Sequence, residues 1–441
     1  MLVLTSICKN DKIRKTPNKE IVMKIDVRDF GAIGDAKTLN TVAIQNAIDE
    51  CFRLGGGQVV FEDGTYLTGK IVMRSNIELH VKSNATILAS PRVEDFPDAS
   101  DEEASHVNTS RLTRWRNNCI IFANECKNIA ITGTGTINGN APAFLRESPE
   151  DELLTYRQID APTPARAVFF TGCENIKIKD IAMIDPPAGW SYWIHDCDFV
   201  TFSGCKVVSN LHYPNCDGIH INCSRNVNIS DCNLCCGDDC IIVRANSASL
   251  KENKVCEKVT VTNCNLTSYA SGIRVGWVND GTIRNCTFSN IVMTDTSYAI
   301  SIAIPSLKIK KGDFLAADVG REYTCIERLS FNNIIMDKIS KFPVEIKIGE
   351  GDQTVDGIRN LYFSGIHAKA LNMPQILGRK ENPIENIYFS DCSFEVYDGS
   401  DIPDLETHGY GAVKADEVRE IPSVKMLNTK NIVFSHTTFG S

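Results

Sequence analysis

The stretch Asn226-Val-Asn-Ile-Ser-Asp231 alternates apolar and polar residues and then turns at an aspartate. The same short pattern returns along the chain, in copies that start at positions 128, 175, 199, 226, 258, 281, 328, 360, 386 and 431. The tightest spacings between copies are roughly 24 to 27 residues, and the longer ones contain insertions. Short alternating strands that repeat at one coil length predict a solenoid, because a β-sandwich needs no fixed repeat.

The fold class that this repeat predicts is all-β: a single-stranded, right-handed parallel β-helix. Its coils would stack at about 4.8 Å, the strand spacing of any sheet, and inward positions would form ladders of like residues. Asn-Cys pairs recur at Asn215, Asn222, Asn263 and Asn285, as stacked turn and interior positions would. A chain of 441 residues exceeds one ordinary domain, and we expect residues 23–441 to form one repetitive β-helix domain.

An amphipathic helix is predicted over residues 40–54, ahead of the repeats. The apolar residues at helical spacing are Val42, Ile44, Ala47, Ile48, Cys51 and Leu54, and three glycines at 55–57 end the helix. We expect this helix to cover the open end of the solenoid, which would otherwise expose unpaired backbone. Breaks in the repeat at 140–165, 305–325 and 396–426 predict long loops that wall a groove.

Composition narrows the class of protein and its partners. Hydrophobic residues make up 43% of the chain and charged residues 23%, as in a globular domain with a large core. The net charge of −9 argues against nucleic acid and anionic membranes as partners. The 18 cysteines lack CxxC pairs with partner histidines, so we expect no zinc but free thiols that pack as small hydrophobic residues.

The N-terminal residues 1–22 are polar and lysine-rich, and we expect them to be a leader or a disordered N-terminus. The apolar run Met1–Cys8 is too short for an export signal, and no stretch approaches transmembrane length. With free thiols suited to a reducing compartment, this predicts a cytoplasmic protein, with secretion as the alternative. The sequence does not predict the oligomeric state.

Three carboxylates stand out in the segments Asn215-Cys-Asp-Gly218 and Cys236-Gly-Asp-Asp-Cys240. Asp217 and Asp238 are 21 residues apart, close to one coil, so they are expected on neighbouring rungs of one face with Asp239 beside them. Like charges at close range raise one another's pKa and destabilise a fold. Glycoside hydrolysis gives such a cluster a use, because it needs one proton donor and one base.

The chain resembles glycoside hydrolase family 28, the polygalacturonase-like enzymes, from about Met23 onward. The motifs are Asp26-Val-Arg-Asp-Phe-Gly-Ala-Ile-Gly-Asp35, Gly56-Gly-Gln-Val-Val-Phe61, Asn215-Cys-Asp-Gly218 and Cys236-Gly-Asp-Asp-Cys240. The first block is shared widely among β-helix proteins, whereas Asn-x-Asp and Gly-Asp-Asp at this spacing are specific. The resemblance implies that Asp238 is the general acid and that Asp217 and Asp239 hold and deprotonate the water.

Departures from the family concern the substrate. Ala270 takes the place of the histidine in the family's Gly-His-Gly segment. Ser301 and Ala303 replace the two cations of an Arg-Ile-Lys that grips the galacturonate carboxylate. Each lost charge-assisted hydrogen bond is typically worth about 1.5–3 kcal/mol. We therefore expect ordinary polygalacturonic acid not to be the preferred substrate.

Six further residues are candidates for substrate binding: Asn215, Trp190, His220, Arg274, Trp277 and Tyr298. Arg274 alternates with Ile273 and Val275, so it points into the groove if those two point inward. His220 stands where the family often has an acid, and would bind a hydroxyl or tune Asp217. The three large aromatic residues would stack on sugar rings, and the alternative for each is an ordinary place in the groove wall.

The function that we expect is an inverting glycoside hydrolase with exo action on pectin-related or other plant-type saccharides, without a metal or a cofactor. Exo action is expected because a cytoplasmic enzyme would meet imported oligosaccharides. The first alternative is a Ca²⁺-dependent polysaccharide lyase, in which the aspartates bind the ion and Arg274 is the base. The second is a non-catalytic glycan-binding β-helix of the tailspike kind.

Overall fold

The computed structural model describes residues 23–100, 102–111, 118–150, 155–161, 163–187, 189–310, 318–397 and 423–440. The expectation for residues 1–22 falls outside these ranges, and so does most of the loop predicted at 396–426. No helix in the described ranges is long and apolar enough to cross a membrane.

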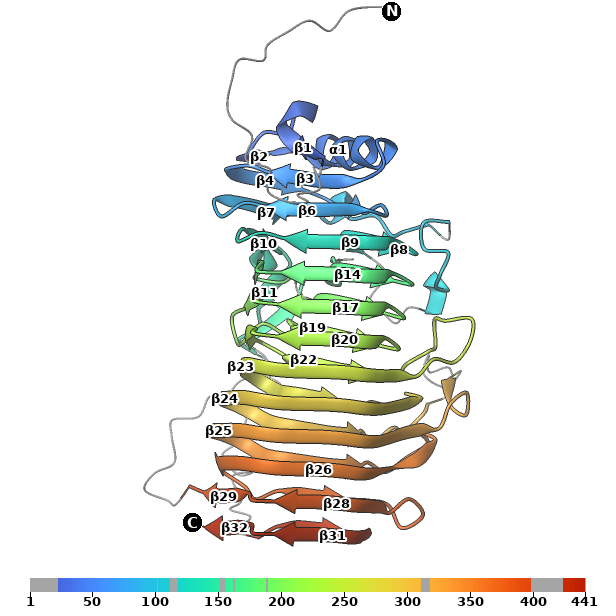
Figure 1. The fold of residues 1–441 in the computed structure, drawn as a ribbon, viewed down its shortest axis with the longest axis vertical. Coiled ribbons are helices and arrows are strands. Elements are labelled where there is room, and N and C mark those ends of the chain that lie inside the picture. The colour runs from blue at the N-terminus through green and yellow to red at the C-terminus, as the bar shows by residue number, and fades with distance from the viewer. Residues whose placement is uncertain are drawn as a thin grey trace, which may run out of the picture.

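The chain winds into a long stack of coils, a right-handed parallel β-helix, which confirms the predicted fold class (Figure 1). Three rows of parallel pairing run along the stack, and we call them the first, second and third sheets. The long strands β23 (Cys256–Val275), β24 (Thr282–Ile304) and β25 (Thr324–Ile348) each turn through all three sheets. β26 (Val355–Ala370) turns through the first two.

The remaining strands each belong to one sheet. The first sheet contains β1 (Lys24–Asp26), β3 (Gly57–Phe61), β6 (Ile77–Val81), β9 (Lys127–Thr132), β14 (Glu174–Lys179), β17 (Asp198–Ser203), β20 (Arg225–Ser230), β28 (Ile384–Ser390) and β31 (Thr429–Ser435). The second contains β2 (Asp35–Leu39), β4 (Gly64–Thr68), β7 (Ala85–Ala89), β10 (Thr136–Asn138), β15 (Ala182–Ile184), β18 (Lys206–Val208), β21 (Asn233–Cys236), β29 (Ser393–Val396) and β32 (Thr438–Gly440). The third contains β5 (Ile71–Val72), β8 (Cys119–Asn124), β13 (Arg166–Thr171), β16 (Trp190–His195), β19 (Ile219–Asn222), β22 (Ile241–Arg244), β27 (Gln375–Leu377) and β30 (Lys425–Leu427).

Ladders of like residues fill the interior, as the repeat predicts. Phe288, Phe331, Phe363, Phe389 and Phe434 stack on successive coils, with ring centroids 4.7, 4.9, 4.6 and 4.9 Å apart. The spacing follows from the strand separation, because residues in register on neighbouring parallel strands lie one coil apart. The core is therefore a column of stacked side chains rather than a globular centre.

A second ladder lies where the chain enters the first sheet. Asn128 donates a side-chain hydrogen bond to Asn76 at 2.8 Å, and Asn175 donates to Asn128 at 2.7 Å. All three residues have a positive φ, a conformation that asparagine tolerates better than most residues. This explains why so many copies of the repeat begin with asparagine.

The helix α1 (Thr41–Arg53) covers the N-terminal end of the stack, as predicted (Figure 1). Its buried residues are Ile44, Ala47, Ile48 and Cys51. The assignment of Val42 and Leu54 to the same face is wrong: their side chains are 72% and 43% exposed. Both lie at the ends of the helix, beyond the area of the first coil that α1 covers.

The remaining short elements lie in loops. They are the 3-10 helices η1 (Val27–Phe30), η2 (Val93–Asp95), η3 (Thr109–Arg111) and η4 (Ala141–Ala143), and an antiparallel pair of strands, β11 (Leu145–Glu147) and β12 (Tyr156–Gln158). The cysteines in the described residues are all free, and every one but the half-buried Cys235 is buried. The thiols therefore pack as small hydrophobic residues, as expected.

A pair of adjacent residues on opposite faces tests the role of the phenylalanine ladder. Phe363→Ala removes a fully buried ring and should lower the free energy of unfolding by about 3–5 kcal/mol. The neighbouring Tyr362 stacks on Tyr388 but is 47% exposed, so Tyr362→Ala should cost about 1 kcal/mol. Urea unfolding followed by circular dichroism measures both, and equal losses would contradict the ladder as the core.

Candidate active site

The two acidic turns lie on neighbouring coils and lead into the third sheet. Ile219 of β19 pairs with Ile241 of β22, so Asp217 and Asp239, each two residues earlier, occupy equivalent positions. The sequence spacing predicts Asp217 and Asp238 on neighbouring coils with Asp239 beside them, and the three do lie on adjoining turns. The residue in register with Asp217 is Asp239, because the turn before β22 sets the register.

Glycine at position 218 permits the coils to approach at this point. Its backbone N–H donates to the carbonyl of Asp239 at 2.9 Å. A Cβ on Gly218 would lie 2.3 Å from the carbonyl oxygen of Cys240, which no side chain tolerates. The Asp-Gly order thus brings the carboxylate of one coil against the turn of the next.

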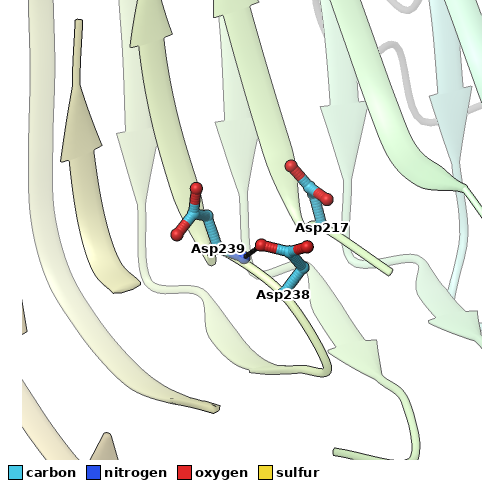
Figure 2. A group of neighbouring side chains, drawn as sticks. All are labelled: Asp217, Asp238 and Asp239. Carbon is cyan, nitrogen blue, oxygen red and sulfur yellow. Dashed lines mark hydrogen bonds between the residues drawn. The ribbon is translucent and has the colours of Figure 1, made fainter. Parts of the chain in front are cut away.

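The three carboxylates form one cluster. One oxygen from each of Asp217, Asp238 and Asp239 lies within 4.8 Å of the other two, and Figure 2 shows the three carboxyl groups gathered on adjoining turns. Asp217 is buried, whereas Asp238 and Asp239 are half-buried. Oδ1 of Asp238 accepts the backbone N–H of Asp239 at 2.9 Å, while Oδ1 of Asp217 has no hydrogen-bond partner within the described ranges.

Burial and mutual repulsion raise the pKa of two of the three carboxyl groups. Burial raises the pKa of Asp217 well above its usual value, and the charges of Asp238 and Asp239 raise it further. Burial likewise raises the pKa of Asp238 to about 7, helped by the charge of Asp239 and opposed by Arg274 and by the backbone N–H of Asn215. A carboxyl group with a pKa near neutrality can give a proton to a leaving group and regain it.

Arg274 lies on the C-terminal side of the aspartates. It follows Ile242 in register on β23 and points outward, because Ile273 and Val275 on either side are fully buried. The Cζ atom of Arg274 lies 4.5 Å from the ring centroid of Trp277, which is 40% exposed. These two residues therefore form one wall beside Asp238.

Residues in register on successive coils form a column along the stack. Ser271 and Tyr298 lie in the same column as Asp217 and Asp239, on the next two coils. Ile241 pairs with Ile273, which places Ser271 next to Asp239, and Ser271 pairs with Tyr298. Ser271, and not Ala270, therefore takes the position beside the aspartates where the sequence comparison expects Ala270. The ring of Tyr298 lies two coils from Asp239, with the Lys341 ammonium 5.3 Å from its centroid.

The next three outward positions in register with Arg274 carry no cation. Ser301 follows Arg274 in register, then Glu345 and Gln375, and Lys425 comes only after these. Oε2 of Glu345 accepts the Ser301 hydroxyl at 3.2 Å, and Oε1 accepts the side-chain amide of Gln375 at 2.6 Å. Lys347 adds a positive charge one coil beyond Ala303. A buried acid thus stands close to where the family places its cations.

A small pocket of about 60 Å³ lies beside the aspartates, along the third-sheet strands β16, β19 and β22. We call it the side pocket. It is lined by Arg111, Trp190, Trp193, His195, His220, Asn222, Arg244, Asn246 and Ser249. Trp190 stacks on His220 with ring centroids 4.0 Å apart. His220 is 4% exposed, and its pKa is lowered well below the usual value by burial and by Arg244 and Arg166, so the imidazole is neutral.

A buried arginine supports the tryptophans of this pocket. The Cζ atom of Arg166 lies 4.5 Å from the ring centroid of Trp190 and 4.1 Å from that of Trp193. Burial lowers the pKa of Arg166 to about 9, partly offset by the charge of Asp217, so the guanidinium stays charged at neutral pH. Cation–π contacts of this kind are strongest when the cation is shielded from water.

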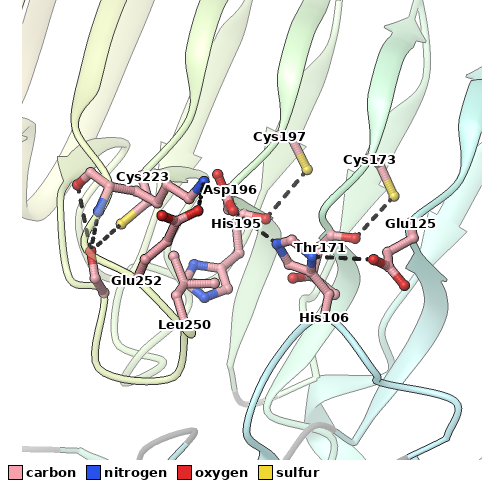
Figure 3. A network of polar contacts seen from close by, with 12 residues as sticks. His106, Glu125, Thr171, Cys173, His195, Asp196, Cys197, Cys223, Leu250 and Glu252 are labelled. Carbon is pink, nitrogen blue, oxygen red and sulfur yellow. Dashed lines mark hydrogen bonds and ion pairs between the residues drawn. The ribbon is translucent and has the colours of Figure 1, made fainter.

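An ion pair joins the loop that contributes Arg111 to the side pocket to a second loop. Arg111, at the end of η3, forms an ion pair with the buried Asp318, 207 residues later in the chain. The segment that carries Arg111 is anchored by His106, whose Nε2 lies 2.8 Å from Asp196 and whose Nδ1 lies 3.6 Å from Glu125 (Figure 3). The loop before β8 therefore forms part of the site, although the breaks in the repeat do not predict it.

The family model of glycosyl hydrolases family 28 matches residues 65–312. The chain belongs to glycosyl hydrolases family 28. A probable polygalacturonase of Vitis vinifera is 27% identical over 221 residues, which cover 49% of this chain and 43% of that protein. Polygalacturonase-2 of Solanum lycopersicum is 27% identical over 327 residues, 66% of this chain and 65% of that protein. The matches thus span less than two thirds of either relative.

A solved structure shares the family 28 fold. The crystal structure of a hyperthermoactive exopolygalacturonase from Thermotoga maritima superposes with a TM-score of 0.67 at 22% identity, over 87% of this chain and 89% of that one. The membership confirms the family that the aspartate motifs indicate.

The structure brings most of the candidate residues together around the family 28 aspartates. Trp190 and His220 line the side pocket, Arg274 and Trp277 lie on the other flank, and the backbone of Asn215 contacts Asp238. Tyr298 is farther away. The sequence analysis did not single out five residues of the site and its surroundings, which are Arg111, Arg166, Trp193, Arg244 and Glu345. The alternation of side chains in β16 and β22 places Trp193 and Arg244 on the outer face, so the sequence pattern could have identified these two residues.

The raised pKa of Asp238 predicts a stability change with pH. The folded state keeps this proton up to about pH 7, whereas an unfolded aspartate loses it near 3.8. Between these values the folded state binds more protons, so stability falls as pH rises through this window. Asp238→Asn removes the buried charge, and we expect its melting temperature to exceed the wild-type value at about pH 8 and to approach it at about pH 4.

The control for this measurement is Asp231→Asn, a change at an exposed turn aspartate of the same coil stack. It should leave the melting temperature unchanged at both pH values. A stabilisation by Asp238→Asn that is equal at both pH values would contradict a buried, strained carboxyl.

Proposed function

We propose that the chain is an inverting glycoside hydrolase in which Asp238 is the general acid and Asp217 and Asp239 position and deprotonate the attacking water. The observation that carries this proposal is the cluster of three carboxylates within 4.8 Å, with the pKa of Asp238 raised to about 7. The pKa of Asp217 is raised as well, but Asp217 is buried, whereas Asp238 is half-buried. Of the two carboxyl groups with a raised pKa, the more accessible Asp238 is the better donor to a glycosidic oxygen, and Asp217 as a carboxylate can hold the water with Asp239.

The reaction follows from the roles of these groups. Asp238 gives its proton to the leaving oxygen as the bond to the anomeric carbon breaks, and the water attacks that carbon from the opposite face. The cluster is tighter than the roughly 6.5–9.5 Å between the two carboxyl groups of most inverting enzymes. The water must therefore lie in front of the cluster rather than between its members.

The substrate that we propose is a pectin-related saccharide other than polygalacturonate itself. The named relatives are polygalacturonases, which supports the pectin class. Ser301 and Ala303 supply no positive charge to a second carboxylate on the C-terminal flank, and although Arg274 and Lys347 stand beside them, the buried Glu345 repels it. Polygalacturonate carries a carboxylate on every sugar, so a carboxylate would lie near Glu345 however the polymer is placed in the groove.

Exo action on short saccharides is the mode that the loops support. The ion pair between Arg111, which lines the side pocket, and Asp318 joins two loops, and we expect these loops to end the groove on that flank. The free, buried thiols support work in a reducing compartment such as the cytoplasm. A saccharide bound at a closed end presents its terminal bond to the aspartates.

Substitution of the aspartates tests the mechanism. Asp238→Asn should lower kcat by about 10²–10⁴-fold, the usual contribution of a general acid, while saccharide binding persists. Asp217→Asn and Asp239→Asn should also lose activity, since each removes a carboxylate that holds the water. Reducing-end assays on pectin-derived, rhamnogalacturonan and neutral oligosaccharides measure the rates, and Asp231→Asn is the control with a normal rate.

The products decide between hydrolysis and its rivals. Proton NMR of the first sugar released should show the inverted anomer, and a retained anomer would contradict the inverting mechanism. Release of galacturonate from polygalacturonic acid as the fastest reaction would overturn the proposed substrate.

A Ca²⁺-dependent lyase remains the second candidate, because the same three carboxylates could hold a cation beside Arg274. Such an enzyme would lose activity with EDTA and release products that absorb in the near ultraviolet. We expect neither effect. A chain in which Asp238→Asn leaves function intact would be a glycan-binding protein.

A further inference from the structure

A fully buried arginine lies behind the tryptophans of the side pocket. Arg166, the first residue of β13, is 1% exposed. Its Cζ atom lies 4.5 Å from the ring centroid of Trp190 and 4.1 Å from that of Trp193. Trp193 is itself held in place, because it stacks on Phe169 with ring centroids 4.4 Å apart. These contacts fix the position of the guanidinium, and the rings carry no net charge that would cancel its own.

The pairing of the strands places Arg166 in the column of the aspartates. Arg166 pairs with Trp190 on the next coil. Tyr192 pairs with Ile219, so Trp190 and Asp217, each two residues earlier, stand at the same register. The long side chain of Arg166 therefore lies against the ring of the one residue that separates it from Asp217 in this column.

The environment of Asp217 favours its protonated form. Asp217 is 5% exposed, and its Oδ1 has no hydrogen-bond partner among the described residues. Asp238 and Asp239 each place a carboxylate oxygen within 4.8 Å of it. Burial and these two charges raise the pKa of Asp217. A protonated carboxyl group cannot take a proton from the attacking water, so a base at this position needs a positive charge close by.

Arg166 supplies a positive charge at this position. Its charge opposes the burial and the repulsion by the two neighbouring aspartates, which raise the pKa of Asp217. The other neighbours of Asp217 on its own and the preceding strand are Trp190 and Ser191, which are uncharged, and His220, which burial keeps neutral. Charges interact strongly where water is excluded, so a buried guanidinium affects Asp217 more than an exposed one would.

We propose that Arg166 is a positioning residue whose charge, fixed between Trp190 and Trp193, keeps Asp217 in the carboxylate form that holds the attacking water. The two ends of the cluster are then served by different cations, Arg166 for Asp217 and Arg274 for Asp238. This inference rests on the proposed function for the role of Asp217 as a base. It extends the catalytic machinery to a residue that lies two coils before the aspartates and needs no contact with the saccharide.

Removal of the charge at position 166 tests the proposal. Arg166→Gln leaves a side chain of similar shape without a charge, and the readout is its kcat/KM relative to the wild-type value. We measure this ratio with a reducing-end assay on pectin-derived oligosaccharides from about pH 4 to about pH 9. An opposite charge nearby lowers the pKa of a carboxyl group by about 1 or more, so the ratio should be about 0.1 in acid and rise toward 1 in alkali. A ratio that stays constant with pH indicates a structural role only and would overturn the proposal.

Two variants separate charge from packing. Arg166→Lys keeps a positive charge without the planar group, and its ratio should stay constant with pH. Arg379→Gln removes another buried arginine, which is 5% exposed and donates from Nε to the carbonyl of Gly349 at 2.7 Å. It should lower the melting temperature, yet its ratio should also stay constant with pH. A rise with pH in either variant as large as in Arg166→Gln would refute the role of the charge.

Melting temperatures test the same pair of residues without a substrate. At about pH 8, Arg166→Gln should lower the melting temperature less in an Asp217→Asn background than in the wild type, because coupled residues give non-additive changes. Equal losses in the two backgrounds would contradict the coupling. Arg166→Met, which buries no polar group, takes the place of Arg166→Gln in both measurements if that variant does not fold.

The two proposals fail separately. A wild-type protein that hydrolyses no saccharide but shows non-additive melting temperatures would refute the hydrolase and leave the coupling of Arg166 to Asp217 standing. Hydrolysis with a ratio that is constant with pH, together with additive melting temperatures, would refute the role of Arg166 and leave the hydrolase standing.

Discussion

In-register stacking of the coils is the constraint on which the rest of the structure depends. A side chain on one coil can meet only those that stand at its own register on the next, about 4.8 Å away. The pairing of Ile219 with Ile241 inside the coil therefore decides that Asp217 meets Asp239 outside it. One residue more or less in the intervening turns would move one aspartate to the opposite face of its strand. The packing of the interior thus determines where the aspartate side chains lie on the surface.

The same constraint explains what could be predicted from the sequence. The alternation in segments such as residues 226–231 indicates strands, and its regular return indicates coils of one length, so the β-helix follows from local information. The proximity of the aspartates follows too, since Asp217 and Asp238 are about one coil apart. The register itself does not follow, because it depends on how many residues each turn absorbs. For this reason the residue in register with Asp217 is Asp239, and the residue in register on the following coil is Ser271 and not Ala270.

The side pocket shows where prediction from the sequence fails. Arg111 and Asp318 are 207 residues apart and meet only because their loops fold over the same coils. No periodic pattern relates them, because both residues lie in loops between strands. The prediction that Val42 and Leu54 belong to the buried face was wrong for a related reason. The periodicity of a helix gives its apolar face, but the coil beneath α1 decides how much of that face is covered.

Electrostatics makes the two flanks of the aspartates different. The family 28 motif concentrates three carboxylates, and burial raises the pKa of Asp217 and Asp238. On the flank of the side pocket lie Arg166 and Arg244, whereas on the C-terminal flank the acid Glu345 follows Arg274 and Ser301 in register, with Lys347 two residues farther along the same strand. Long-range charge interactions are weakened by water but act strongly in partly buried sites. A carboxylate beside Ser301 would therefore be attracted by Arg274 and repelled by the buried Glu345, so these two neighbours decide whether an acidic sugar is tolerated there.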